Sequence, residues 1–267
     1  MHSIGSSKPF RFTVGPEKRE FTIHEDLVAR QSPALESLVN GSFSEAQKGH
    51  AVLESVDEHT FAFFIEYVYT GHYGDVDQYT PRPVYYTDEE SGLESEELDY
   101  ESGWEGNSDN ARPSEKRLWF RFVRRSREFW KRRAYAARED EVEHQQAEGA
   151  VAAKAANKPG IEVFLRHARL QVFADYYGII GLMDLTFEHM GQLFIGFEPK
   201  VKDTGVILEL LRFCYDTPAP DALKSFIVLY AACKAEVLWM NKGFQKLVDK
   251  NREFSLAFLG QIMGTKG

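Results

Sequence analysis

The first part of the chain alternates between apolar and polar positions in the way a β-hairpin does. Residues 10–14 alternate, residues 21–23 resume the alternation, and Gly15-Pro16 lies between the two runs. A period of two is typical of half-buried strands, and a Gly-Pro pair is a turn signal. We therefore predict a hairpin near the N-terminus and a further short strand over residues 51–54.

Two helices are predicted in the same part of the chain. Ser32 followed by Pro33 has the form of a helix N-cap with proline at the first helical position, and Gly41 stands where a C-terminal cap glycine belongs. A second helix is predicted from Asp57, with apolar residues spaced i, i+3, i+4, i+7 over 61–68 and Gly71 at its end.

The pattern changes sharply in the middle of the chain. Residues 75–110 contain twelve acidic residues and one basic residue, and residues 112–133 contain ten basic residues. The acidic part has few side chains that could build a core, so we predict that it is disordered. Within the basic part, Trp119, Phe122, Val123 and Trp130 share one helical face. We expect a largely disordered insertion over 74–160 that carries a basic helix near 114–138.

The last hundred residues are predicted to be entirely helical. Apolar residues recur at helical spacing over 165–176, where Gly178 interrupts the pattern, and again over 183–194. Further amphipathic segments follow between residues 203 and 262, which we take as a helical C-terminal extension.

Composition and charge narrow the classes of function. The chain has 267 residues, 43% of them hydrophobic, and a formal net charge of −9, which opposes nucleic-acid binding by the chain as a whole. Cys214 and Cys233 have neither disulfide-framework nor zinc-ligand spacing, which favours a reducing compartment. No signal peptide and no bilayer-length apolar run is visible. We expect a protein of the cytoplasm, the nucleus or both, and not a secreted one.

Several stretches occur together in the order and spacing of a known family. They are Phe21-Thr22-Ile23-His24, Ser32-Pro33-Ala34-Leu35, Gly41-Ser42-Phe43-Ser44-Glu45-Ala46, Tyr67-Val68-Tyr69-Thr70-Gly71-His72-Tyr73, His167-Ala168-Arg169 and Phe173-Ala174-Asp175-Tyr176-Tyr177-Gly178. The chain thereby resembles a BTB/POZ domain, in the version common in filamentous fungi.

The resemblance implies a fold and a general role. The fold would be α+β, a small β-sheet flanked by α-helical hairpins, split into residues 9–73 and 161–197 by the insertion at 74–160 and followed by the extension at 203–262. Members of the family serve protein–protein contact. The eight residues before position 9 are too few for the family's swapped dimer element, so we expect a monomer or a weak dimer.

A sharper expectation concerns Phe43 and Glu45. In BTB adaptors that recruit a cullin scaffold, an apolar residue, any residue and then glutamate stand at this place, and Phe43 and Glu45 match that motif. The resemblance thus implies a substrate adaptor of a cullin-based ubiquitin ligase, with an aromatic anchor beside a charge-assisted hydrogen bond. The alternative is that Phe43 packs locally and Glu45 is solvated.

The basic segment leaves several interpretations open. As an exposed amphipathic helix it could bind nucleic acid, an anionic membrane or a calmodulin-like groove, or part of it could be a nuclear import signal. This would make the chain a nuclear regulatory or scaffolding protein whose basic helix contacts nucleic acid or an acidic partner. Alternatively, the acidic run 88–109 neutralises it electrostatically. The candidate patch consists of Arg117, Arg121, Arg124, Arg125, Lys131, Arg132 and Arg133.

The remaining residues give no support for enzymatic chemistry. The eight histidines lack HExxH spacing, no GxSxG sequence occurs, and no glycine-rich phosphate loop follows a predicted strand. We expect no catalytic, cofactor or metal site. For His24, which stands where the family places a histidine between strand and helix, we expect a hydrogen-bonded structural role.

Overall fold

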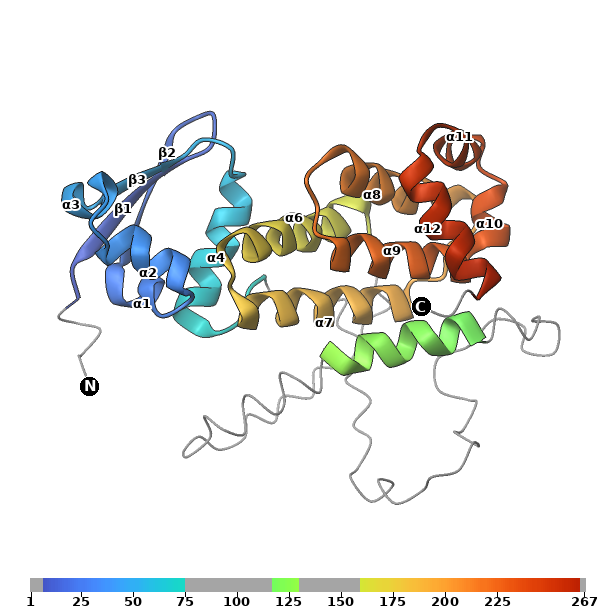
Figure 1. Ribbon diagram of the computed structural model, residues 1–267, viewed down its shortest axis with the longest axis horizontal. Helices are drawn as coiled ribbons and strands as arrows, with labels where there is room; N and C mark the ends of the chain where they lie inside the picture. The colour runs from blue at the N-terminus through green and yellow to red at the C-terminus, as the bar shows by residue number, and fades with distance from the viewer. Residues whose placement is uncertain (1–6, 75–116, 130–158, 265–267) are drawn as a thin grey trace, which may run out of the picture.

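The computed structural model describes residues 7–74, 117–129 and 159–264, which form a mixed α+β molecule that is mostly helical. One three-stranded sheet is present among these residues, with the strand order β2-β1-β3. Figure 1 shows the sheet at one end of the molecule and a helical half at the other, joined by two long helices, α6 and α7.

The sheet follows the predicted hairpin. β1 (Pro9–Val14) lies in the middle and pairs antiparallel with β2 (Arg19–His24), which sets Phe12 opposite Phe21. β3 (His50–Leu53) pairs parallel with β1 on its other side. Gly15 begins the turn with φ +74°, a conformation that glycine adopts without steric cost. The prediction of two alternating strands, a turn and a third short strand is confirmed.

Three short helices, α1 (Glu25–Ala29), α2 (Pro33–Asn40) and α3 (Ser44–Lys48), connect β2 to β3, and the longer α4 (Glu58–Thr70) follows β3. The predicted caps are confirmed, since Ser32 Oγ accepts a hydrogen bond from the Leu35 amide at 3.2 Å and Asp57 Oδ1 accepts one from the Thr60 amide at 2.9 Å. Gly41 ends α2 in an extended conformation, and a Cβ there would lie 2.1 Å from the Ser37 carbonyl oxygen.

From residue 161 to residue 263 the chain is helical, as predicted. The elements are α6 (Ile161–Tyr177), α7 (Ile180–Gly196), the 3₁₀ turn η3 (Val201–Asp203), α8 (Thr204–Asp216), α9 (Asp221–Cys233), α10 (Ala235–Trp239), α11 (Lys242–Lys250) and α12 (Arg252–Met263). Gly178 ends α6 with φ +68°, and α7 begins two residues later.

Buried apolar side chains form two clusters that share α6 and α7. The first, which we call the N-terminal core, contains the sheet, α1, α2 and α4 together with the end of α6 and the start of α7. The second, the C-terminal core, contains the start of α6, the rest of α7 and helices α8 to α12. Within α6, Phe164 belongs to the C-terminal core and Phe173 to the N-terminal core.

A helix from the predicted insertion contributes to the C-terminal core. Residues 117–129 are helical and lie alongside α7, as Figure 1 shows in green. Phe122 is fully buried 5.1 Å from Phe226, and Phe129 stacks on Phe187 with ring centroids 4.3 Å apart. The expectation of an exposed amphipathic helix is therefore wrong for its apolar face, because that face is covered by α7 and α9.

The other residues of 74–160 that carry predictions lie outside the described residues. These include the acidic run, Trp130, Lys131, Arg132 and Arg133. Within the described ranges, no helix combines the length and the apolar character that crossing a lipid bilayer would require.

Candidate functional site

The loop between α2 and α3 presents Phe43 to solvent. Phe43 is the N-cap residue of α3, and 61% of its surface is exposed. The loop is held by its own hydrogen bonds, from the Gln47 amide to the Phe43 carbonyl at 3.2 Å and from Gln47 Nε2 to the Ser42 carbonyl at 3.2 Å. The alternative in which Phe43 packs locally therefore does not hold, and its ring is available for contact.

The exposure of Phe43 is unusual in this molecule. Fifteen of its twenty phenylalanines are buried, and Phe43 has the largest exposed fraction of all twenty. Glu45 lies two residues further on, half-buried, with Oε2 accepting a hydrogen bond from Ser44 Oγ at 3.1 Å. An exposed aromatic ring beside a carboxylate on a fixed loop is suited to docking a protein partner.

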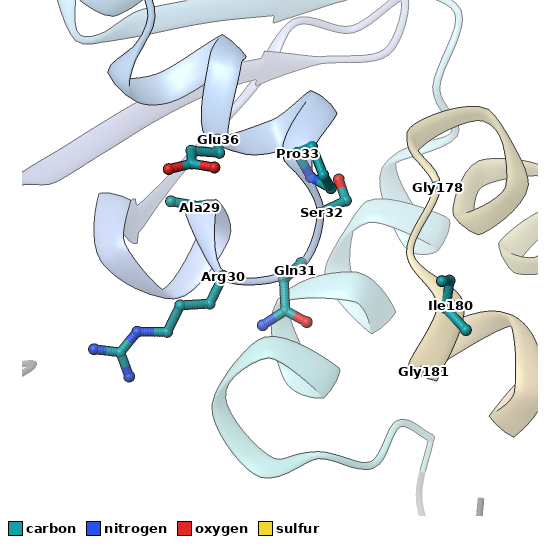
Figure 2. A pocket seen from close by; sticks show the side chains of 9 residues that line it. All are labelled: Ala29, Arg30, Gln31, Ser32, Pro33, Glu36, Gly178, Ile180 and Gly181. Carbon is teal, nitrogen blue, oxygen red and sulfur yellow. The ribbon is translucent and has the colours of Figure 1, made fainter. Parts of the chain in front are cut away.

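A shallow pocket of about 440 Å³ opens at the other end of α2, as shown in Figure 2. It lies between the α1–α2 turn and the α6–α7 turn. Ile180, 71% exposed, stands on one side, and the exposed Arg30 and Glu36 stand on the other. The Tyr67 hydroxyl approaches the backbone of Gly181 closely, since a Cβ there would lie 2.5 Å from it. The complete lining consists of Ala29, Arg30, Gln31, Ser32, Pro33, Glu36, Gly178, Ile180 and Gly181.

The pocket could receive an apolar side chain with a polar or charged neighbour. Ala29, Pro33 and Ile180 line it together with Arg30 and Glu36, and Ser32 Oγ already accepts a hydrogen bond from the Leu35 amide. No pattern in the sequence indicates this pocket, since the two turns that form it are about 145 residues apart.

The arginines of helix 117–129 lie on its outer side. Arg117, Arg121 and Arg124 are exposed, while Arg125 is half-buried. Arg121 Nη2 donates to Gln261 Oε1 at 2.9 Å and Arg125 Nη2 donates to Ser225 Oγ at 3.0 Å. Burial lowers the pKa of Arg125; the nearby Glu128 raises it, and the charge of Arg121 lowers it. The predicted patch is thus a basic surface partly tied to α9 and α12.

A buried polar cluster joins the end of α4 to α6 and α7. The Tyr73 hydroxyl and His167 Nδ1 are hydrogen-bonded at 2.7 Å, and the His189 ring lies 5.5 Å from the His167 ring. Burial, then the charges of His189 and Arg166, hold the pKa of His167 well below its usual value of 6.5. His167 is therefore neutral near pH 7, and the cluster fixes the chain just before it leaves the N-terminal core.

Other predicted residues have structural roles. His24 Nδ1 is hydrogen-bonded to the Tyr69 hydroxyl at 2.8 Å, which confirms the role expected for this histidine. Cys214 and Cys233 are unpaired and buried, and burial raises the pKa of each thiol to about 12. Both behave as small apolar side chains. Across the part of the chain that the structure describes, no group of three His, Cys, Asp or Glu side chains could hold a metal ion.

The features described above lie on separate parts of the surface. They are Phe43 and Glu45 at one end of α2, the pocket at the other end, and a separate basic face on helix 117–129. Comparisons of the chain with models of protein families, with curated proteins and with solved structures found no match.

Proposed function

We propose that this chain is a non-enzymatic interaction protein of the BTB/POZ type that acts as a substrate adaptor for a cullin-based ubiquitin ligase. The observation that carries the proposal is the exposed Phe43 two residues before Glu45, on a loop held by its own hydrogen bonds. The small sheet with helices around it is compatible with the fold that the resemblance implies.

The energetics of the loop favour a docking role. Burying a phenylalanine side chain contributes about 1.5–3 kcal/mol, so an exposed Phe43 forgoes that stabilisation until a partner covers it. Glu45 would accept a charge-assisted hydrogen bond at the edge of the same contact. The pocket extends the surface, because the eight residues of α2 place it about 12 Å from the loop. A partner helix of two or three turns would span both.

The two ends of the molecule would bind different proteins. The scaffold would bind at the sheet end, where Phe43 and the pocket lie, and the client would bind the helical end. The long α6–α7 hairpin holds these ends at a fixed separation, as an adaptor requires (Figure 1). Such a protein would work in the cytoplasm, the nucleus or both.

The test is binding to a recombinant fungal cullin N-terminal domain. The wild type is compared with Phe43→Ala plus Glu45→Ala, by pull-down and then by titration. Losing a central aromatic anchor costs at least about 2 kcal/mol, so we expect affinity to fall about thirtyfold or more. Phe120→Ala is the matched control, since Phe120 is also an exposed phenylalanine, 42% exposed, but lies on helix 117–129. Equal binding by the double variant would show that Phe43 and Glu45 are not the contact.

The second candidate is a nuclear regulatory or scaffolding protein whose basic helix contacts nucleic acid or an acidic partner. The observation that favours it is the outward position of Arg117 and Arg124 on a helix whose other side is anchored in the core. Phosphate contacts would make binding fall steeply with added salt. A mobility shift of duplex DNA that persists in the Arg117→Glu plus Arg124→Glu variant would rule this candidate out.

A further inference from the structure

The outer face of α12 is apolar although it faces solvent. On one side of the helix, Phe254 and Phe258 are buried. On the opposite side, Leu256, Leu259 and Met263 follow one another at the spacing i, i+3, i+7. Their exposed fractions are 61%, 48% and 74%. No charged residue occurs from position 254 to 264. An apolar stripe on the outer side of a helix is normally covered by a contact, so this face is suited to docking.

The neighbouring helices give this apolar stripe a basic border. Gln261, on α12, accepts the hydrogen bond from Arg121. α9 connects the two helices, since Lys224 Nζ lies 2.9 Å from Glu253 on α12 and Ser225 accepts the hydrogen bond from Arg125. Helix 117–129, α11 and α12 together contain nine basic and three acidic residues, in a chain whose net charge is −9.

One segment of this chain has the complementary chemistry. Residues 88–109, which lie outside the described ranges, contain ten acidic residues, no basic residue and four large apolar or aromatic side chains: Leu93, Leu98, Tyr100 and Trp104. Only seven residues separate Asp109 from Arg117. Seven residues reach about 25 Å when extended, and α12 is about 18 Å long, so the tether permits the contact.

We propose that residues 88–109 bind in cis to the surface formed by the outer stripe of α12 and the arginine face of helix 117–129. Leucine and tryptophan side chains would cover Leu256, Leu259 and Met263, while the carboxylates would lie beside Arg121 and Arg124. Tethering supplies an effective concentration in the millimolar range, which makes even a weak contact well populated. This inference does not depend on the cullin contact, because no residue is shared with it.

A second copy of the chain fits the stripe less well. Two-fold packing of α12 against α12 would bring two equally basic borders together, and like charges across an interface oppose association. The acidic segment covers the same apolar side chains and neutralises the border as well.

The experiment is limited proteolysis of the full chain with a glutamate-specific protease, followed site by site by mass spectrometry. The rate of cleavage between residues 89 and 105 is compared with that of the free peptide 88–109. We expect about tenfold slower cleavage in the wild-type chain, and we expect the rate to approach that of the peptide in 0.5 M salt. Leu256→Ser plus Leu259→Ser should remove the protection, and Val201→Ser, at a residue 59% exposed, should keep it.

Three results would overturn the proposal. The first is cleavage of the wild-type chain as fast as the free peptide, which needs no variant. The second is protection that survives Leu256→Ser plus Leu259→Ser in a variant with an unchanged circular dichroism spectrum. The third is light scattering that finds a dimer in the wild type and a monomer in that variant, which would assign the stripe to a second copy.

Discussion

The N-terminal and C-terminal cores are built from different kinds of contact. The N-terminal core joins strands and helices that are far apart in sequence, as where Phe61 meets Phe173 with ring centroids 6.1 Å apart. The C-terminal core is made of helices that mostly follow one another, with helix 117–129 as an exception that reaches α9, where Phe122 meets Phe226. Both cores nevertheless depend on the same hairpin of α6 and α7.

Because the two cores share this hairpin, we expect the two regions to unfold together. α6 contributes Phe164 to the C-terminal core and Phe173 to the N-terminal core. α7 contributes Leu182 to the N-terminal core and Phe194 to the C-terminal core. A helix cannot lose the packing of one half without strain on the other. The surfaces of the two regions differ, since the sheet end carries Phe43 and the pocket and the helical end carries the basic and apolar faces.

The largest loss of stability is expected for Phe122→Ala, which removes the contact between helix 117–129 and the C-terminal core. Removing a fully buried phenylalanine should lower the free energy of unfolding by about 3–5 kcal/mol, although the residue lies in the charged middle part of the sequence. Urea unfolding measures this, with Phe120→Ala, 42% exposed, expected to cost less than about 1 kcal/mol. A small effect of Phe122→Ala would mean that helix 117–129 is not part of the C-terminal core.

A close approach between α7 and helix 117–129 predicts a smaller loss of stability. A Cβ on Gly191 of α7 would lie 2.9 Å from the Ser126 Cβ, so Gly191→Ala should destabilise the protein by about 1–3 kcal/mol. Ser126→Gly should restore part of that loss in the Gly191→Ala background while destabilising the wild type. Additive effects of the two changes in a double-mutant cycle would contradict the close approach.

Acid should weaken the junction between the cores through His167. Its folded pKa is lowered below 6.5, so the unfolded chain binds the proton more readily. The stabilisation is therefore complete above pH 6.5 and is lost as the pH falls towards the folded value, by at most about 1.4 kcal/mol per pH unit. Urea midpoints at pH 7.5 and 5.5 measure the loss, and His167→Phe should flatten that slope relative to the wild type.

The smallest expected effect on stability is that of Phe43→Ala. Because 61% of this side chain is exposed, truncation should change the free energy of unfolding by less than about 0.5 kcal/mol. Thermal unfolding in the absence of any partner checks this. A loss of 2 kcal/mol or more would instead assign Phe43 to the N-terminal core.

Local signals predicted local structure well. The hairpin, the caps at Ser32 and Asp57 and the ends at Gly71 and Gly178 follow from a few neighbouring residues each, and the structure has them where the sequence placed them. The five-residue helices α1, α3 and α10 were not predicted, because a single turn has too few positions to display a period.

Tertiary placement could not be predicted in the same way. Trp119, Phe122 and Val123 were recognised as one face, but the surrounding charge favoured an exposed helix, and only α7 and α9 show that the face is buried. The exposure of Phe43 depends on the loop beyond Gly41 turning outward. The pocket and the Tyr73–His167 bond each join residues roughly 95 to 145 positions apart, for which a single sequence contains no signal.

The shared hairpin also has a consequence for biosynthesis. On the ribosome, the strands and α4 emerge first, while Phe173 and Leu182, which close their apolar side, follow roughly 110 residues later. At 5–20 residues per second this interval lasts roughly 5–20 s. During it Phe61 and Phe64 have no partner from α6, so their apolar surface stays open to chaperones until α6 and α7 emerge.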